Sequence, residues 1–329
     1  MTNTHRQTDR LRRAGKLTGL MGLALVLLLF FPGESFSQNG VFPNPKHPDQ
    51  VFVAGSGNTA FNLHFVELLK AKLGPEVDIT PYSDSASIAQ PETLVISLGA
   101  RALSRVHQQS PKPPTLALMV SEKQFSGYRD RSGARISAIY NDPPLLQQAL
   151  LGTLILPQAT RIALLVRPGE EKDFEPLIAN LRKLNLDGRV FTVDGNDTLI
   201  ATLSRALSYG DFLLALPDEV IFNPRTIKHI LLTAYRRNRI VIGPNRAFVG
   251  AGALASTYTP ITTVVDGVAR HLNAYSASGQ LLPADHPSDF AVDVNTQVAR
   301  SLNIPVRDVA TLERLLKEQL NALPTGVTP

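Results

Sequence analysis

The 329-residue sequence contains no cysteine and no tryptophan, and only 6% of its residues are aromatic. Without cysteine, the chain cannot form a disulfide, use a thiol as a nucleophile or carry the lipid-modified cysteine that anchors many exported proteins. Without tryptophan, and with no aromatic pair after the first expected strand, stacking on a sugar ring has little support. The composition excludes thiol chemistry and disfavours carbohydrate stacking.

Catalytic signatures are also missing. The sequence has no G-x-S-x-G elbow, no phosphate-binding P-loop and no H-E-x-x-H zinc motif. The histidines after the N-terminal segment lack the spacing of metal ligands; they are His47, His64, His107, His229, His271 and His286. We therefore expect no enzyme activity, no metal and no cofactor.

The net charge of +5 has a local origin. Residues 1–37 hold five basic and two acidic side chains, a net +3, so the rest of the chain carries +2. No dense Lys/Arg face interleaved with aromatic residues remains, as binding along a nucleic-acid backbone would require. We expect no nucleic-acid partner.

The N-terminus has the order of a secretory signal. Five basic residues precede an uncharged apolar segment at 17–31, Pro32-Gly33 follows, and Ser35 and Ser37 suit a cut after Ser37. A retained membrane anchor is the alternative, but it needs about 20 apolar residues. We predict a periplasmic protein, cleaved after Ser37 and without a lipid anchor.

Short apolar segments alternate with amphipathic helical patterns after residue 48. The expected strands are 51–55, 93–99, 115–121, 136–140, 161–167, 189–194, 212–218 and 239–243. The expected helices are 59–72, 100–108, 144–155, 172–184, 197–208 and 223–236. Continuously apolar strands separated by helices are typical of parallel sheets covered on both faces. Two doubly wound, Rossmann-like sheets in tandem are the simplest α/β architecture.

Proline and glycine pairs indicate where the chain passes between the two lobes. Asn141-Asp142-Pro143-Pro144 and Gly243-Pro244 interrupt the pattern. We expect crossings near 141–144, 243–246 and 276–288. The predicted parts are a linker at 38–48, lobe 1 at 49–142 plus 246–276, lobe 2 at 143–245 plus 284–305, and a C-terminal helix and tail at 306–329.

Several ordered segments resemble the ABC-transporter substrate-binding proteins of the type I periplasmic fold. They are LVISLGARAL, ISAIYNDPPLLQQALLGTLILPQATRIALLVRPG, LALPDEVIFNPRTIKHILLTAYRRNRIVIG and the tail GALAST…DGVARHLNAY…DFAVDVNTQVARSLNIPV. The resemblance spans residues 49–305. It implies two lobes joined by a three-stranded hinge, which close on a small ligand.

The candidate ligand contacts are polar residues that follow the expected strands, because ligands settle at the carboxyl ends of parallel strands. They are Ser56, Asn58, Gly99, Arg101 and Ser121 in lobe 1, Arg167, Asp218 and Asn245 in lobe 2, and Tyr258 after the returning strand. Arg167 would suit an anion and Asp218 an ammonium or a hydroxyl. Asp218 could instead cap a helix, Arg167 could stabilise a turn, Arg101 could be only solvated, and Tyr258 could seal the hinge.

A competing signal is the G-x-G-x-x-A string at 55–60, which lies between a strand and a helix as in a dinucleotide-binding site. The acidic residue that should bind ribose is poorly placed, since Asp78 lies near the start of its segment and Asp84 lies in a loop. A second string, at 250–255, precedes a strand.

Three functions therefore stay open. The leading hypothesis is a monomeric solute receptor that delivers a small polar ligand to an ABC permease. The second is a periplasmic sensing partner of a membrane kinase or cyclase, and the third is an NAD-dependent enzyme. Neighbouring permease genes would favour the first, and a kinase or cyclase gene the second.

Overall fold

The computed structural model of the chain describes residues 48–132 and 135–327, which belong to one compact unit. The expected signal peptide at 1–37, and nearly all of the expected linker at 38–48, lie outside the described residues.

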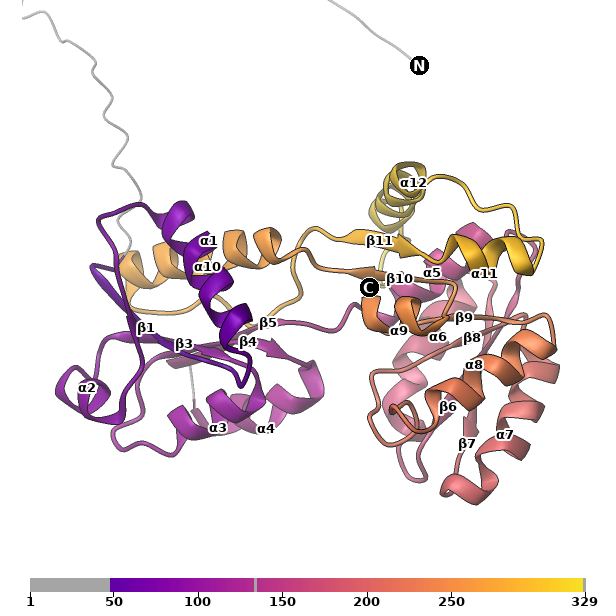
Figure 1. Cartoon of the computed structure of the whole chain (residues 1–329), viewed down its shortest axis with the longest axis horizontal. Helices are drawn as coiled ribbons and strands as arrows, with labels where there is room; N and C mark the ends of the chain where they lie inside the picture. Colours follow the sequence, from indigo (N-terminus) through magenta and orange to yellow (C-terminus); the bar gives the residue numbers. More distant parts are fainter. Residues whose placement is uncertain (1–47, 133–134, 328–329) are drawn as a thin grey trace, which may run out of the picture. The chain divides into compact units, whose positions relative to one another are not determined.

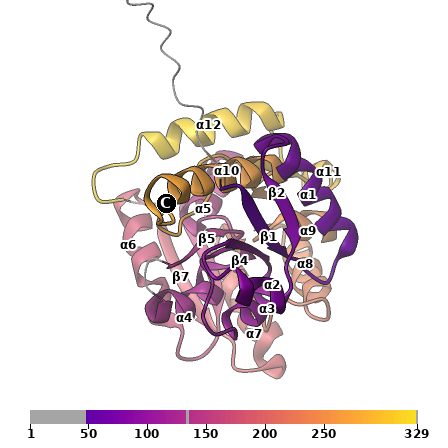
Figure 2. The same cartoon turned by 90° about the vertical axis from the view of Figure 1, so that its left-hand side faces the viewer.

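Lobe 1 contains a five-stranded parallel sheet of order β2-β1-β3-β4-β5. The strands are β1 (Gln50–Ala54), β2 (Asp78–Pro81), β3 (Leu94–Leu98), β4 (Thr115–Val120) and β5 (Ile136–Tyr140). The helices are α1 (Thr59–Leu73), α2 (Asp84–Ala89), α3 (Ala100–His107), α4 (Glu122–Ser132) and α10 (Ile261–Ser278). Helices α1 and α10 cover one face of the sheet, and α3 and α4 cover the other (Figures 1 and 2).

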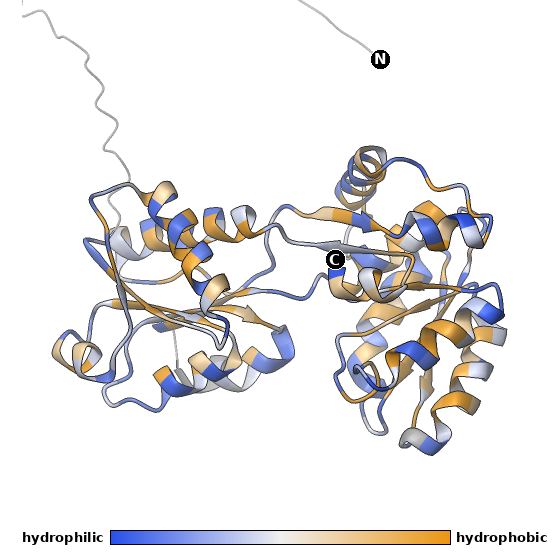
Figure 3. Cartoon of the chain, viewed as in Figure 1, coloured by the Kyte–Doolittle hydropathy of each residue, from blue (hydrophilic) through white to orange (hydrophobic). Residues whose placement is uncertain are grey.

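The strands of lobe 1 are buried on both faces, as their continuous hydrophobicity predicts. In β1, Val51 and Val53 pack with the α1 and α10 side chains, whereas Phe52 and Ala54 pack with α3. Figure 3 shows these inner strands in the hydrophobic colour. A sheet covered in this way leaves only its ends free to bind a ligand.

Lobe 2 contains a six-stranded sheet of order β11-β10-β9-β8-β6-β7, parallel except between β10 and β11. The strands are β6 (Arg161–Val166), β7 (Asp187–Thr192), β8 (Phe212–Leu214), β9 (Ile240–Ile242), β10 (Ala255–Tyr258) and β11 (Ala291–Val294). The helices are α5 (Leu145–Ile155), 3-10 helix η2 (Glu171–Phe174), α6 (Glu175–Lys183), α7 (Asn196–Tyr209), α8 (Ile227–Arg236), α9 (Arg246–Ala251), α11 (Thr296–Ser301) and α12 (Val309–Asn321).

The predicted fold class is confirmed, and every predicted strand overlaps an observed one. The sequence pattern did not indicate the polar helices α2 and α4. Helix α8 begins at Ile227 and not at residue 223, because Asn223 accepts hydrogen bonds from the Arg225 and Thr226 amides and holds a loop there.

The predicted second crossing is wrong by about 15 residues. Residues 246–258 were expected in lobe 1, but β10 pairs with β9 and β11, and Leu254 and Ala255 belong to the lobe 2 core. Gly243-Pro244 marks only a turn before α9. The chain returns to lobe 1 at Pro260, where α10 begins and packs against α1.

The other two crossings lie close to the predictions. Helix α5 follows Pro144, and the third crossing comes after Asp285, whose backbone bonds to β5 of lobe 1 at Ala138 and Tyr140. That pairing keeps residue 285 with lobe 1, although 284–305 was expected in lobe 2. The predicted C-terminal helix is present as α12, which packs on α5 and buries Leu312 and Leu316 in the lobe 2 core.

Candidate functional site

A cleft of about 920 Å³ lies where the carboxyl ends of strands from both sheets meet. Lobe 1 lines it with residues that follow β4 and β5, and lobe 2 with residues that follow β6, β8 and β9. In open parallel sheets this edge is where ligands bind, and the volume suits a small molecule. We refer to this cavity as the cleft.

Arg167, directly after β6, is held between two carboxylates of the same lobe. Its Nε donates to Asp218 Oδ2 at 2.7 Å, and its Nη2 lies 2.5 Å from Glu170 Oε1. Asp218 also accepts hydrogen bonds from the backbone amides of Val220 and Ile221, both at 2.8 Å. The two predicted contacts, Arg167 and Asp218, therefore bind each other.

The pKa values agree with this pairing. Burial disfavours the charged form of Asp218, but the Ile221 amide and Arg167 outweigh it, so its pKa is lowered. The hydrogen bond to Asp218 raises the pKa of Arg167. Both groups are charged at neutral pH. Asp218 also acts as a cap, which is the alternative role predicted for it from the sequence.

The lobe 1 side of the cleft holds Ser121, Glu122 and Asp142. Ser121 and Gln124 bond reciprocally at the start of α4, each side chain accepting the other's backbone amide at 3.0 Å. Asp142 Oδ1 accepts the Glu122 amide at 3.2 Å. Burial raises the pKa of Asp142, while its own backbone amide and His286 act against that rise. His286 packs edge-on against Tyr140, with ring centroids 5.0 Å apart.

Met119 brings an apolar side chain to the same side of the cleft. The register between β4 and β5 shifts between Leu118 and Val120, and Met119 at this bulge has a φ of +57°. Its side chain is 37% exposed and lines the cleft. Bulges redirect side chains in this way near binding sites.

Among the described residues, an ion pair joins the two lobes across the cleft. Lys123 Nζ of α4 lies 2.6 Å from Glu170 Oε1, the atom that also bonds Arg167. Lys123 is 65% exposed and Glu170 is 20% exposed. Solvent therefore weakens the pair, which a ligand can replace at little cost.

Four of the nine predicted site residues line the cleft, namely Ser121, Arg167, Asp218 and Asn245. Asn245 also caps α9, because its side chain accepts the Ala247 amide at 3.0 Å. Sequence reasoning missed Met119, Asp142, Glu170, Phe174, Glu219 and His286. Asp142 lies two residues after the end of β5, and this position could have identified it.

The other five predicted residues lie outside the cleft lining. Ser56 bonds Asn62 of α1 and Asn58 caps α1, so both stabilise their own turn. Gly99 has a φ of +91°, a conformation that favours glycine, and Arg101 is exposed at the start of α3. The Arg246 guanidinium lies 5.1 Å from the Tyr258 ring centroid, at the second crossing.

The G-x-G-x-x-A string at 55–60 does not have the geometry of a dinucleotide-binding site. At Gly55 a Cβ would lie 2.7 Å from Asn62 Nδ2, so this glycine makes room for the Asn62 side chain. Asp78 pairs in register with Gln50 at the start of β1, the opposite end of the strand from the glycines. A ribose-binding acid belongs beside the glycines.

A buried polar network lies between the first two crossings. Gln147 and Gln148 of α5 bond Thr257 and Ser256 of β10 at 2.7 and 2.9 Å, and the Thr257 amide donates to Gln148 Oε1 at 2.9 Å. All four residues are at most 6% exposed. The network joins two segments that lead into the hinge.

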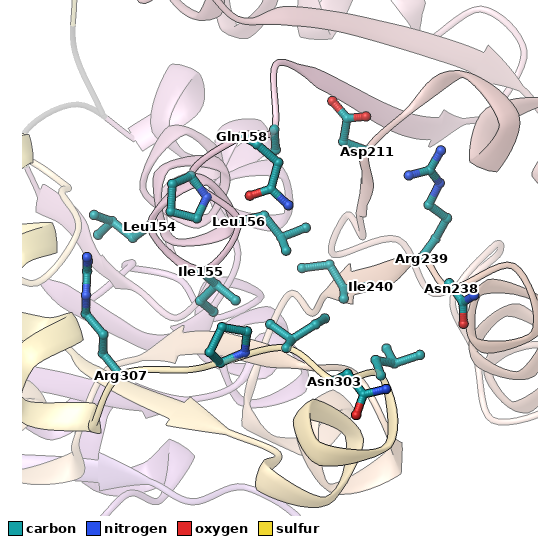
Figure 4. Close-up of a pocket in the computed structure, with 15 residues that line it drawn as sticks. Leu154, Ile155, Leu156, Gln158, Asp211, Asn238, Arg239, Ile240, Asn303 and Arg307 are labelled. Carbon is teal, nitrogen blue, oxygen red and sulfur yellow. The ribbon is translucent and has the colours of Figure 1, made fainter.

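A second pocket, of about 600 Å³, lies at the amino ends of the lobe 2 strands (Figure 4). Ile155, Leu156 and Ile240 form its apolar part, with Arg239 and Arg307 among its lining residues. Asp211 belongs to the lining but is bonded to the Thr160 and Arg161 amides. Only lobe 2 contributes to this pocket.

The described residues hold neither a candidate membrane span nor a candidate metal site. None of the helices in 48–132 and 135–327 has both the length and the hydrophobicity needed to cross a membrane. In the same part of the chain, no three His, Asp or Glu side chains are grouped closely enough to hold a metal ion.

No protein-family model and no curated protein sequence matches this chain. Solved structures do match. A ligand-free, open substrate-binding protein with adhesive properties from Clostridium difficile aligns with a TM-score of 0.64 at 14% identity, over 79% of this chain and 97% of that one.

An ABC domain from Streptococcus pneumoniae in complex with L-Trp has a TM-score of 0.55 at 14% identity, over 82% of this chain and 98% of that one. A conserved domain protein from Vibrio cholerae has a TM-score of 0.54 at 15% identity, with the same coverage. The chain has the type I periplasmic binding protein fold. At this identity the likeness concerns the fold alone, so ligand and partner must be argued from the residues.

Proposed function

We propose that the chain is a solute receptor that captures a small polar ligand in the cleft and presents it to a membrane ABC permease. The observation that carries the proposal is the cleft itself, at the carboxyl ends of strands from both lobes and beside the first and third crossings. The Streptococcus pneumoniae neighbour in complex with L-Trp supports it as an example of ligand binding by this fold.

Ligand binding would act through the hinge. A ligand that contacts Arg167 or Glu219 on one side and Ser121 or Asp142 on the other makes all its contacts only when the lobes close. It therefore shifts the equilibrium toward the closed form by the difference between its affinities for the two forms. The permease would bind that closed form.

The absence of tryptophan offers a direct test. Val220 is 60% exposed and lines the cleft, whereas Leu232 on α8 is 46% exposed and lies outside the lining. Val220→Trp and Leu232→Trp therefore each place a single indole in the protein. Solutes screened against both variants should change the fluorescence of Val220→Trp alone, with saturation.

A thermal scan of the unaltered protein completes the test. A ligand at 100 times its Kd should stabilise the folded state by about 2.7 kcal/mol. If solutes change both indoles equally, or neither, the cleft is not the binding site. Transport is then tested by deleting the gene: loss of uptake of the bound solute supports a permease partner, and unchanged uptake argues against one.

A further inference from the structure

The cleft is strongly acidic although the chain as a whole is basic. Six carboxylates line it and only two fully cationic side chains do. The carboxylates are Glu122, Asp142, Glu170, Asp173, Asp218 and Glu219, and the cations are Lys123 and Arg167. With His286 neutral, the lining carries a formal charge of −4.

Both cations are already paired with protein carboxylates. Glu170 Oε1 contacts Lys123 Nζ and Arg167 Nη2, and Asp218 Oδ2 contacts Arg167 Nε. The four other carboxylates of the lining have no ion pair with any described residue. A ligand carboxylate would have to displace Glu170 or Asp218 and would then face this excess of like charge.

The chain also fills the positions where an anion would bind. Backbone amides at the carboxyl ends of parallel strands attract anions. Here Asp218 accepts from the Val220 and Ile221 amides, and Asp142 accepts from the Glu122 amide. These three amides therefore already hold protein carboxylates and are not free to bind a ligand anion.

Apolar side chains lie among these acids. Phe174 and Phe248 are half-buried on the lobe 2 side, with Val220 exposed beside Glu219, and Met119 lines the lobe 1 side. An aromatic face attracts an organic cation through its quadrupole, and more strongly once water is excluded. Acids and aromatic rings in one cavity suit a molecule that carries positive charge on an apolar body.

We propose that the cleft binds an organic cation, an amine or quaternary ammonium compound with an apolar portion and no carboxylate. The inference rests on the proposed receptor function and names its ligand class. The ammonium takes the place of Lys123 at Glu170, while the four carboxylates without an ion pair supply the attraction. The apolar portion lies against Phe174 and Phe248.

A series of compounds with the same ring but different charges tests the proposed ligand class. Phenethylamine, 2-phenylethanol, 3-phenylpropionate and L-phenylalanine share one ring and differ in charge, and choline and cadaverine extend the cationic arm. Titrated into Val220→Trp, the cations should bind at least tenfold more tightly than the neutral and anionic members. Added salt should weaken their binding, because screening reduces the attraction.

Lys123→Met tests the ligand class independently, because the proposal predicts that this substitution makes cation binding tighter and not weaker. Removing an internal competitor and one positive charge should tighten cation binding by about two- to fivefold. Lys72→Met is the matched control, since Lys72 also pairs with an acid, Asp266, at 2.6 Å, but outside the cleft. Glu219→Gln should weaken cation binding by about fivefold, with Glu76→Gln as its control.

The outcomes separate the two proposals. Tighter binding of 3-phenylpropionate than of phenethylamine, or weaker cation binding by Lys123→Met, overturns the ligand class and leaves the receptor function standing. If no member of the series changes the Val220→Trp signal, and none raises the Tm of the unaltered protein, the ligand class fails; the receptor function fails too if the general solute screen gives no signal either.

Discussion

The two sides of the cleft differ in how firmly the chain holds their side chains. In lobe 2, Arg167 and Asp218 bond each other, Asp218 accepts two backbone amides, and Gln148 and Thr257 bond each other in the interior. In lobe 1, Glu122 and Lys123 are exposed, and Met119 has a strained backbone conformation. Lobe 2 thus holds the more ordered half of the site, and lobe 1 the half that a ligand must still order.

This difference indicates that the two lobes contribute differently to ligand binding. Fixed charges lose little entropy when a ligand arrives, so lobe 2 is suited to make the first contacts. The exposed Lys123 can change its partner, and Glu122 can gain one, as the lobes close. Substitutions of the bonded side chains in lobe 2 should therefore affect stability, and substitutions of the exposed side chains in lobe 1 should affect binding.

Among the polar residues of the two lobes, the largest effect is expected at Gln148. Gln148→Ala leaves the Thr257 amide without its acceptor in a position that water does not reach. The buried polar groups that lose their partners should together lower the free energy of unfolding by roughly 2 to 4 kcal/mol. Urea denaturation should show this loss.

Gln124→Ala is the lobe 1 counterpart. Gln124 is exposed and its side chain accepts only the Ser121 amide, so the loss should stay below about 0.5 kcal/mol. Equal losses in the two variants would remove the contrast between the lobes.

His271 is the exception in lobe 1, because its side chain is buried there and lowers the stability of the fold at acid pH. It lies on α10 at 6% exposure, its Nδ1 has no hydrogen-bond partner among the described residues, and burial, followed by the charge of Arg270, lowers its pKa to about 4. The unfolded chain takes up the proton near pH 6.5, before the folded one does. Stability is therefore complete above about pH 6.5 and falls toward pH 4.

The loss attributable to His271 over this window is at most roughly 3 kcal/mol. His271→Leu should make the unfolding free energy less dependent on pH by that amount, measured by urea titration at pH 7 and pH 4.5. Identical pH profiles for the variant and the unaltered protein would show that His271 takes up its proton at the same pH in the folded and unfolded states, so that its pKa is not lowered.

Asp218 should show a smaller effect in lobe 2. Asp218→Asn keeps an oxygen for the Val220 and Ile221 amides but removes the charge that faces Arg167, at a cost of about 1 to 2 kcal/mol. Because the pKa of Asp218 is lowered in the folded state, its stabilising charge is lost as the pH falls below about 4.

Glu122→Gln, on the lobe 1 side, should leave the unfolding free energy unchanged in the same denaturation experiment. A loss at Glu122 as large as that at Asp218 would contradict the division between a fixed lobe 2 and an adjustable lobe 1.

The strands and the two-lobe fold could be predicted because apolar runs such as RIALLVR need burial on both faces. The cleft residues were found where a polar side chain follows a strand, directly at Ser121 and Arg167 and after a few residues at Asp218. The pairing of Arg167 with Asp218 joins residues 51 positions apart, and no local pattern encodes it. The second crossing was misplaced because a turn at Gly243-Pro244 resembles a boundary, whereas β10 is fixed by its strand partners.

Met119 offers a small effect on stability and the sharpest separation of stability from binding. A left-handed conformation costs a residue other than glycine about 1 kcal/mol, so Met119→Gly relieves strain that offsets the lost side-chain contacts. The unfolding free energy should change by less than about 1 kcal/mol, whereas Leu118→Ala next to it, fully buried, should cost roughly 2 to 5 kcal/mol. Ligand affinity, measured by calorimetry, should nevertheless fall in Met119→Gly, because the apolar surface on the lobe 1 side is gone. Unchanged affinity would mean that the bulge serves the sheet and not the cleft.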